Sequence, residues 1–188
     1  MNRKQDFIDL YTKYIQRPGS AELLEWLEDS DFFTAPASTK FHGNYEGGLC
    51  EHSVNVWEEL VRLLKAYPEV RVTAESAAIV SLLHDLCKVG VYKTELRNQK
   101  VNGFWVQKPV YVFKEDFCYG GHGSKSVYLI QKHMNLTEAE ATAINCHMGP
   151  WDRSPSDYSL GNAYEQFPLA LLVHWADESA TYIRESKM

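Results

Sequence analysis

Several features of an exported or membrane-bound protein are missing from this sequence. No apolar run approaches the roughly 20 residues that a bilayer-spanning helix needs. The N-terminal stretch MNRKQDFIDLYTKYI is charged and amphipathic, which predicts that it is not a signal peptide. The cysteines form no CxxC pair and no dense framework, so we expect reduced thiols in a cytoplasmic protein. These residues, either small core side chains or thiolate ligands, are Cys50, Cys87, Cys118 and Cys146.

The sequence also lacks an excess of positive charge. Its net charge is −6, with 25 acidic against 19 basic residues. This balance argues against a chain that coats duplex nucleic acid or an anionic membrane surface. It does not exclude a small anionic substrate, because a local cationic site can override the net charge. We therefore expect a small-molecule partner, and the sequence leaves the oligomeric state open.

The length and composition are those of one globular domain. The 188 residues are 45% apolar and 23% charged. A domain of this size buries roughly 70% of the surface of its unfolded chain, which is enough for a substantial core. The sequence has no internal repeat, low-complexity tract or linker. We therefore expect a single domain over 1–188, with an N-terminal helical extension over 1–40 and a core over 41–185.

Apolar residues at helical spacing predict a mainly α protein. Ser20 and Thr73 are the expected N-caps of two helices. Thr137 and Glu140 have the spacing of a capping box. The predicted helices cover 3–16, 21–29, 51–66, 74–88, 123–134, 138–147 and 164–185, with loops over 31–49 and 151–162.

One segment of different composition interrupts the helices. Residues 91–113 are rich in Val, Tyr, Phe and Trp, and Asn102-Gly103 lies within them. Runs of β-branched and aromatic residues on both sides of Asn-Gly predict a β-hairpin. The predicted fold class is therefore mainly α, a helical bundle with a small inserted hairpin near 91–113. The aromatic part of the hairpin could cover a cleft or pack against the body, and composition does not decide between these.

The stretch SLLHDLCK at 81–88 places polar side chains in an apolar helix. Burying Asp85 next to His84 is costly unless something pairs with both. Asp177 lies in a similar apolar setting in LALLVHWADESA, and His52 lies near the start of another helix. Imidazole nitrogens and carboxylate oxygens are good ligands for first-row metal ions. Two His and two Asp from three helices would make one metal site of this kind.

Two further histidines lie beside breaks in the helical pattern. His122 is in YGGHGSKS and His147 is in NCHMGPWD. Asp85 could bridge to a second ion held by these two, and a pair of ions can activate a water and hold a phosphoryl group. Lys88 lies one helical turn beyond Asp85, where its charge would meet an anionic substrate or transition state. The alternative for Lys88 is a cation that complements the helix dipole.

This ordered set of residues resembles the HD-domain superfamily of metal-dependent phosphohydrolases. His84-Asp85 followed by Lys88 matches the HDxxK form of the family's signature. The stretch GGLCEHS at 47–53 resembles its first-histidine motif, and HWAD at 174–177 resembles its last-aspartate motif. The resemblance covers residues 40–185 or thereabouts. It rests on the order of six positions, His52, His84, Asp85, His122, His147 and Asp177.

The resemblance implies a helical bundle around a metal site with one or two divalent first-row ions (Fe, Mn, Zn, Ni or Co). Asp85 and Lys88 would be catalytic residues in the attack of a metal-activated water on phosphorus. The implied ligands are His52, His84, Asp85 and Asp177 for the first metal, and His122 and His147 with bridging Asp85 for the second.

The resemblance also bears on the substrate. FHGNYEGGLCEHS and GGHGSKS are similar to the HD domain of a group of bacterial 3′-to-5′ exoribonucleases, which carry an additional nucleic-acid-binding domain. This chain has no room for one, so we expect a smaller substrate, a phosphomonoester or phosphodiester in a nucleotide or short oligonucleotide. The GYP signature of the cyclic-dinucleotide phosphodiesterases is missing. Two alternatives stay open, a di-iron oxygenase with similar ligands and a non-catalytic nucleotide-binding sensor.

Residues near the predicted ligands are candidates for substrate contacts. Lys88 and Arg153 could bind phosphate, Arg153 through two parallel hydrogen bonds. Trp151 could stack on a base. A loop packed by its own side chains is an equal alternative for 151–153. His42 could contact phosphate or be an ordinary loop histidine, and His174, three residues before Asp177, could line the same site.

Overall fold

The computed structural model describes residues 3–114, 120–153 and 157–186. Cys118 lies outside the described residues, and the other three cysteines are buried free thiols. The α-helices are α1 Lys4–Tyr14, α2 Ser20–Asp29, α3 Gly48–Ala66, α4 Ala74–Leu82, α5 His122–Gln131, α6 Glu138–Asn145, α7 Ser159–Gln166 and α8 Pro168–Ser179. The shorter elements are the 3₁₀ turns η1 Leu86–Lys88 and η2 Gly149–Asp152, the π turn η3 Ala180–Arg184, and the strands β1 Tyr92–Val101 and β2 Phe104–Phe113.

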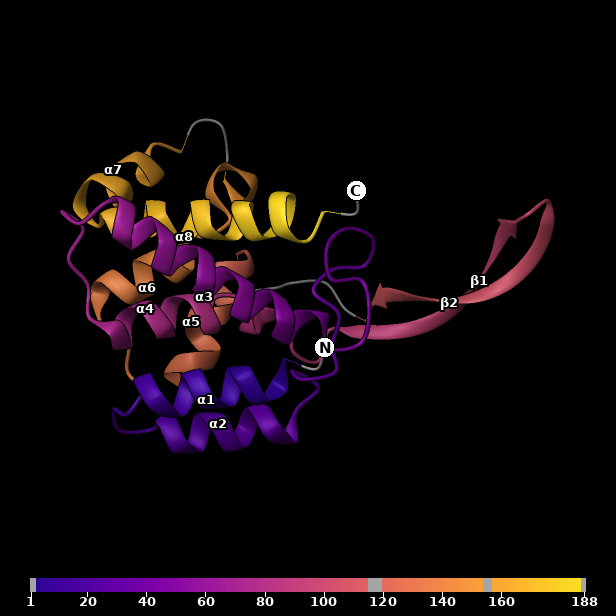
Figure 1. Ribbon diagram of the computed structural model, residues 1–188, viewed down its shortest axis with the longest axis horizontal. Helices are drawn as coiled ribbons and strands as arrows, with labels where there is room; N and C mark the ends of the chain where they lie inside the picture. Colours follow the sequence, from indigo (N-terminus) through magenta and orange to yellow (C-terminus); the bar gives the residue numbers. More distant parts are fainter. Residues whose placement is uncertain (1–2, 115–119, 154–156, 187–188) are drawn as a thin grey trace.

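The helices pack around α3. This helix contacts α8, α4 and α1, and Figure 1 shows α1 and α2 on one side of the body with α8 on the other. One cluster of buried side chains runs through these elements and includes Phe7, Leu23, Leu60 and Val173. Burial of each such large apolar side chain contributes roughly 1.5–3 kcal/mol. None of the helices in the described part of the chain has the length and apolar character to cross a membrane.

Several helix boundaries differ from the sequence predictions; α3 begins at Gly48, three residues before its predicted start, and α5 and α6 end at Gln131 and Asn145, before their predicted ends. The helix predicted over 74–88 ends at Leu82, because the backbone at Leu83 turns to a φ of −117° and a ψ of 0°. His84 and Asp85 therefore lie in a break between α4 and η1. The predicted cap at Ser20 is also wrong. Gly19 occupies the N-cap position with a positive φ of 88°, and Ser20 is the first helical residue.

The C-terminal helix predicted over 164–185 is divided in the structure. Phe167 leaves helical geometry with a φ of −130° and a ψ of 80°. The residue before a proline is disfavoured in the α region, whereas proline itself is well suited to the first helical position. Pro168 therefore starts α8 instead of continuing α7. The start of α7 at Ser159 also shortens the loop predicted over 151–162.

Two predicted N-caps are confirmed. The Oγ1 atom of Thr73 accepts a hydrogen bond of 2.9 Å from the backbone N–H of Ser76 at the start of α4. At the start of α6, Thr137 and Glu140 each accept a hydrogen bond from the backbone N–H of the other. These reciprocal contacts satisfy N–H groups that a helix leaves without intrahelical partners.

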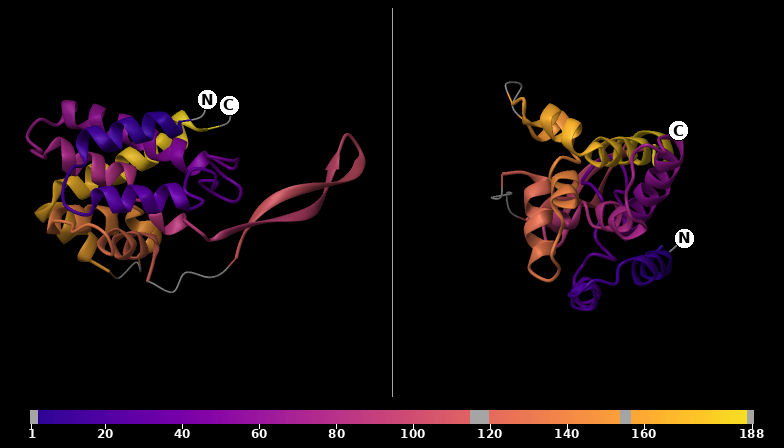
Figure 2. Two further views of the ribbon diagram at one scale, coloured as in Figure 1. Left: turned by 90° about the horizontal axis from the view of Figure 1, so that it is seen from below. Right: turned by 90° about the vertical axis from the view of Figure 1, so that its left-hand side faces the viewer.

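The predicted hairpin is confirmed and projects from the body. β1 pairs antiparallel with β2 from Tyr92–Phe113 at the base to Val101–Phe104 at the tip. Asn102 and Gly103 have φ values of 49° and 89°, as a two-residue turn with positive φ at both positions requires. Figure 2 shows the twisted ribbon extending away from the helices. We call residues 92–114 the arm.

A buried ion pair ties the N-terminal helices to the rest of the body. Both guanidinium nitrogens of Arg17 contact the carboxylate of Glu140, at 2.7 and 2.8 Å, and one also contacts Glu75 at 3.1 Å. The side chain of Glu140 is completely buried. Burial would raise the pKa of Glu140, but the hydrogen bonds from Arg17, Thr137 and Ser76 outweigh it and hold this pKa below its usual 4.5.

Replacing Arg17 should destabilise the fold in a pH-dependent way. Arg17→Met leaves the Glu140 carboxylate buried without its cation, so we expect the free energy of unfolding at pH 7 to fall by about 3 kcal/mol. Because the folded pKa of Glu140 is depressed, its contribution is present above pH 4.5 and is lost as the pH falls through the folded pKa.

Urea unfolding of wild type and Arg17→Met between pH 3 and 7 measures this effect. The difference between the two proteins should shrink below pH 4.5. Lys13→Met, which removes an exposed cation of α1, is the control and should stay within about 0.5 kcal/mol of wild type. An Arg17→Met variant as stable as this control at pH 7 would contradict the assignment.

Candidate metal centre

His84 and His147 are oriented by the ends of the helices that precede them. Each lies just after a helix, and its Nδ1 contacts a carbonyl oxygen three residues earlier. These distances are 2.8 Å from His84 to Ser81 and 2.7 Å from His147 to Ile144. A carbonyl oxygen can only accept, so both Nδ1 atoms carry the proton and both Nε2 atoms present a lone pair. The Nε2 atoms lie 3.4 Å from Oδ2 and Oδ1 of Asp85, respectively.

His52 reaches the same point from α3. Its Nδ1 lies 3.1 Å from the carboxylate of Glu185, which also accepts a hydrogen bond of 2.8 Å from Asn55. Its Nε2 lies 3.1 Å from Asp177 and 3.3 Å from Nε2 of His84. Burial would lower the pKa of His52, but Glu185 and Asp177 together raise it to about 10. A proton therefore lies between His52 and Asp177 whenever no other cation takes its place.

Asp85 joins the converging side chains. It is 2% exposed, and its Oδ2 lies 2.6 Å from Nζ of Lys88. Burial raises the pKa of a carboxyl group, but here Lys88, His84 and His147 hold it well below its usual range. The pKa of Asp177 is lowered in the same way by His52 and the other histidines, against the effect of burial. Both carboxylates are therefore ionised at neutral pH.

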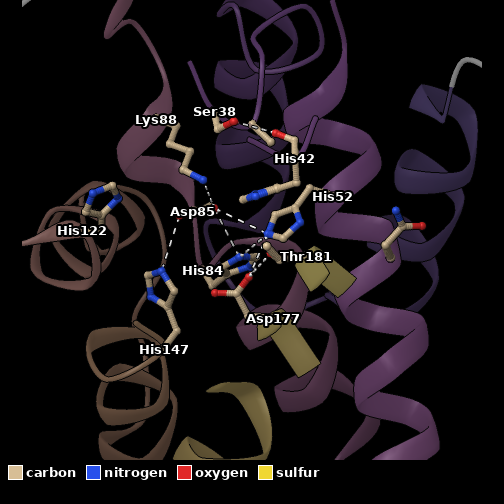
Figure 3. A network of polar contacts seen from close by, with 12 residues as sticks. Ser38, His42, His52, His84, Asp85, Lys88, His122, His147, Asp177 and Thr181 are labelled. Atoms are coloured by element: carbon tan, nitrogen blue, oxygen red, sulfur yellow. Dashed lines mark hydrogen bonds and ion pairs between the residues drawn. The ribbon is translucent and has the colours of Figure 1, made fainter. Parts of the chain in front are cut away.

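This arrangement fits a metal ion. Four groups of possible ligand atoms each lie within 4.8 Å of one another. One of them is His42, His52 and Glu185. Of the other three, the first two are His52, His84 and Asp85, and His84, His147 and Asp177. The Nε2 atoms of His52 and His84 lie 3.3 Å apart, so a metal ion that displaces the proton of His52 could be held by both rings. Among the described residues, the buried Nε2 of His147 has no hydrogen-bond partner. Figure 3 shows these side chains pointing toward Asp85 from different elements.

The third group extends the centre toward α5. It contains Asp85, Cys87 and His122. His122 begins α5, where its backbone N–H donates to Asp152 at 2.8 Å, and its Nδ1 lies 3.5 Å from the sulfur of Cys87. Burial raises the pKa of the Cys87 thiol well above its usual value, with the charge of Asp85 acting in the same direction. A neutral thiol is a poor ligand, so the imidazole and the carboxylate are the stronger donors of this group.

A cavity of about 290 Å³ adjoins these side chains. Asp85, Lys88, Asp177 and His122 line it together with His42. Both ring nitrogens of His42 are buried and have no hydrogen-bond partner within the described part of the chain. Burial, aided by the charges of nearby cations, lowers the pKa of His42 to about 4. The lining also includes three exposed aromatic side chains, Phe41, Trp151 and Tyr182, which are 77%, 72% and 64% exposed.

The structure brings most of the predicted site residues together. The other five predicted ligands and Lys88 lie around Asp85, and Trp151 lines the cavity. Arg153 lies elsewhere, in a hollow with Asp152 and Asp157, and its guanidinium contacts Asp157 and Cys146. His174 supports the site from behind, since its Nδ1 donates to the carbonyl oxygen of His147 at 2.8 Å.

Sequence reasoning missed two residues that orient His52. Glu185 and Asn55 are ordinary polar residues of a helical chain, and Glu185 lies 133 positions beyond His52. Asn55 could have been found from its position, because it lies one helical turn after His52. No local signal marks Glu185, whose role depends on how η3 returns to α3. Carboxylates that accept from the far nitrogen of a ligating histidine fix its tautomer and raise its basicity.

Comparison with known proteins agrees with this geometry. The family model named "HD domain" matches residues 49–182, which include all six predicted ligands. The chain belongs to the HD domain family, and the resemblance inferred from the sequence is confirmed.

A curated relative gives a more particular likeness. The chain is similar to the "3'-5' exoribonuclease YhaM" of Geobacillus sp. (strain WCH70), with 31% identity over 93 residues. The match covers 46% of this chain and 28% of that protein. Together, the family and the relative support a metal-dependent phosphohydrolase in general. No solved structure matches the chain.

Removing the carboxylate that orients His52 should weaken metal binding. We expect Glu185→Ala to lower the affinity for a divalent ion by about 10–100-fold, because the Nδ1 proton of His52 loses its acceptor. Glu185→Gln keeps an acceptor oxygen without the charge and should fall between Ala and wild type. Competition against a chromogenic chelator measures these affinities. Glu69→Ala, at an exposed acidic position, is the control, and equal affinities in all four proteins would show that Glu185 has no such role.

Proposed function

We propose that the protein is a metal-dependent phosphohydrolase that cleaves a phosphomonoester or phosphodiester bond in a nucleotide or short oligonucleotide. The observation that carries this proposal is the convergence of imidazole lone pairs and two ionised carboxylates beside a cavity that also contains the ammonium group of Lys88. Metal ligands and a cation that face one cavity suit an anionic substrate with a phosphorus centre.

The proposed ligands divide into two groups that share Asp85. When bound, one or two divalent ions would lower the pKa of a water and draw charge from the phosphoryl oxygens. The chain orients the ligands before any ion arrives, through the contacts of His84 and His147 with carbonyl oxygens and of His52 with Glu185. The first group is His52, His84, Asp85 and Asp177, and the second is Asp85, His122 and His147.

Lys88 supplies a fixed positive charge to the cavity. Burial would lower the pKa of Lys88, but Asp85 at 2.6 Å outweighs this and raises it, so the ammonium stays charged at neutral pH. One of its three protons is directed to Asp85, and the group has further donors for a phosphoryl oxygen. A preorganised cation of this kind stabilises charge that develops in the transition state. His42, neutral at pH 7, can donate one further hydrogen bond to the substrate.

The rim of the cavity supports a nucleotide as the substrate. Phe41, Trp151 and Tyr182 expose aromatic faces there. An aromatic ring can stack on any base, because every base has a π-face. The activity in the name of the partly matching relative, a 3'-5' exoribonuclease, is in keeping with this class of substrate. A cavity of about 290 Å³ suits one nucleotide unit better than a folded nucleic acid.

The metal content tests the proposed ligands. Protein purified without chelators should contain about two equivalents of a first-row ion per chain. His84→Ala and Asp85→Ala should abolish metal retention, because both residues contact the other ligands directly. His122→Ala should leave about one equivalent. Elemental analysis measures all four proteins.

His133→Ala is the matched control, since that histidine packs beside Trp26 outside the centre, and it should retain the wild-type content. If wild type contains one equivalent of metal, His122 and His147 would instead be residues that contact the substrate. An Asp85→Ala variant with full metal content would make the ligand assignment wrong.

The role of Lys88 is tested by hydrolysis. We expect the metal-loaded protein to release product from a panel of nucleotides and short oligonucleotides. Lys88→Met should lower kcat by about 100-fold, the usual effect of losing one donor to the transition state. Lys88→Arg keeps the charge and should recover part of the rate. The metal content of each variant separates this effect from the removal of an ion.

The same panel distinguishes the other functions that fit these ligands. Oxygen consumption without release of phosphate or nucleotide would identify an oxygenase. Nucleotide binding without product would identify a sensor. Either result would overturn the proposed hydrolase.

A further inference from the structure

The outer part of the arm extends away from the other described residues. Ten residue pairs join β1 to β2, so the ribbon is about 34 Å long. Tyr92 at the base is 8% exposed, whereas Phe104 and Trp105 near the tip are 76% and 71% exposed. Figures 1 and 2 both show the ribbon clear of the helices. An isolated two-stranded ribbon with exposed apolar side chains is marginally stable and prone to association. A partner that covers these side chains would stabilise the ribbon.

The arm is positively charged on an acidic protein. Residues 92–114 carry a net charge of +4 against −6 for the whole chain, so the remaining residues carry −10. The acidic side chain is Glu95, which pairs with Lys93 at 3.0 Å and with Arg97 at 3.7 Å. A polyanion would therefore be attracted to the arm and repelled by the body. The basic residues are Lys93, Arg97, Lys100, Lys108 and Lys114.

One face of the ribbon carries aromatic rings together with Lys100, whereas Lys93, Arg97 and Lys108 lie on the opposite face. Residues directly paired across the strands share a face. The pair Lys100–Trp105 lies near the tip, and the pairs Leu96–Pro109, Thr94–Tyr111 and Tyr92–Phe113 follow toward the base on the same face. Leu96, Trp105 and Phe113 are 65%, 71% and 46% exposed. Exposed rings beside a cation, on a ribbon whose other face is basic, are suited to unpaired bases and their phosphates.

The loop that contains Lys40, Phe41 and His42 lies next to both the arm and the candidate metal centre. Phe41 and His42 line the metal-site cavity. Lys40, from the same loop, lines a second hollow of about 320 Å³ together with Arg97 and Tyr111 of the arm. A ligand that occupies both hollows must extend along this loop. A short strand could occupy both hollows with successive nucleotides.

We propose that the arm binds single-stranded nucleic acid, RNA or DNA, and directs one end of the strand toward the metal centre. The direction of the strand toward the metal centre rests on the proposed function. The binding of the strand rests on the arm alone. A duplex does not fit this surface, because its bases are stacked on each other and cannot stack on Trp105 and Tyr111. The acidic body of a second copy of this chain is the other surface that would attract the arm.

Binding of a labelled strand tests the proposal. The probe is a 12-nucleotide oligouridylate with phosphorothioate linkages, and fluorescence anisotropy measures its affinity for the metal-loaded protein. Trp105→Ala should weaken binding by about tenfold, the usual effect of removing the ring under one stacked base. Trp105 is exposed, so the variant should fold. Lys100→Gln with Lys108→Gln should reduce the slope of log K against log salt by about 0.7 for each phosphate that the protein no longer neutralises.

The controls separate stacking from simple attraction between charges. Tyr67→Ala with Lys65→Gln removes an exposed ring and a cation at the far end of α3 and should leave the affinity at the wild-type value. Oligothymidylate of the same length should bind similarly if the arm reads bases and phosphates, and more weakly if it also contacts ribose hydroxyls. An abasic strand of equal charge and a 12-base-pair duplex should both bind more weakly than oligouridylate.

The outcomes distinguish this proposal from the proposed function. Equal binding of the abasic strand, or wild-type affinity in Trp105→Ala, would overturn the arm as a stacking surface. A dimer that Trp105→Ala converts to a monomer in light scattering, with oligonucleotide affinity unchanged, would overturn it in favour of self-association. Arm-dependent binding without any hydrolysis would sustain the arm and reject the hydrolase. Hydrolysis of nucleotides, with strand binding unaffected by the arm variants, would support the hydrolase and reject the arm as a binding surface.

Discussion

The buried charge of Asp85 is the constraint on which the rest of the structure depends. An ionised carboxylate in a protein interior costs several kcal/mol unless cations and hydrogen-bond donors surround it. Here Lys88, His84 and His147 lie within 3.4 Å of its two oxygens. These partners come from the break after α4, the turn η1 and the end of α6. The helices of the body are thus held in the positions that neutralise one side chain, and those positions define the cavity.

Helix ends orient the histidines around Asp85 better than continuous helices would. The last carbonyl oxygens of a helix have no intrahelical partner. At α4 and α6 such oxygens accept from Nδ1 of His84 and His147. One contact therefore gives a carbonyl group at the helix end a donor, selects the histidine tautomer and directs its Nε2 to the centre. This explains why α4 ends at Leu82 although apolar residues continue beyond it.

Local patterns in the sequence predicted those features of the fold that depend on neighbouring residues. Asn102-Gly103 defined the hairpin turn, Thr137 with Glu140 defined a helix start, and the order of His and Asp residues identified the family. The end of α4 at Leu82 was not predictable, because hydrophobic periodicity does not record where a carbonyl oxygen will find a side-chain donor. Glu185 was missed for a related reason, since its contact with His52 forms only when distant elements pack.

Net charge was the weakest guide, because charge acts on a ligand through its local distribution. The value of −6 argued only against a chain that coats duplex nucleic acid or an anionic membrane, and it does not show that the arm carries +4 and the remaining residues −10. Screening limits such fields to about 10 Å at ordinary salt, so a strand on a ribbon that extends away from the body is affected mainly by the arm. The acidic body then repels the strand from the rest of the surface. An acidic protein can in this way bind a short single strand and still repel a duplex, whose charge density is greater and whose bases are hidden.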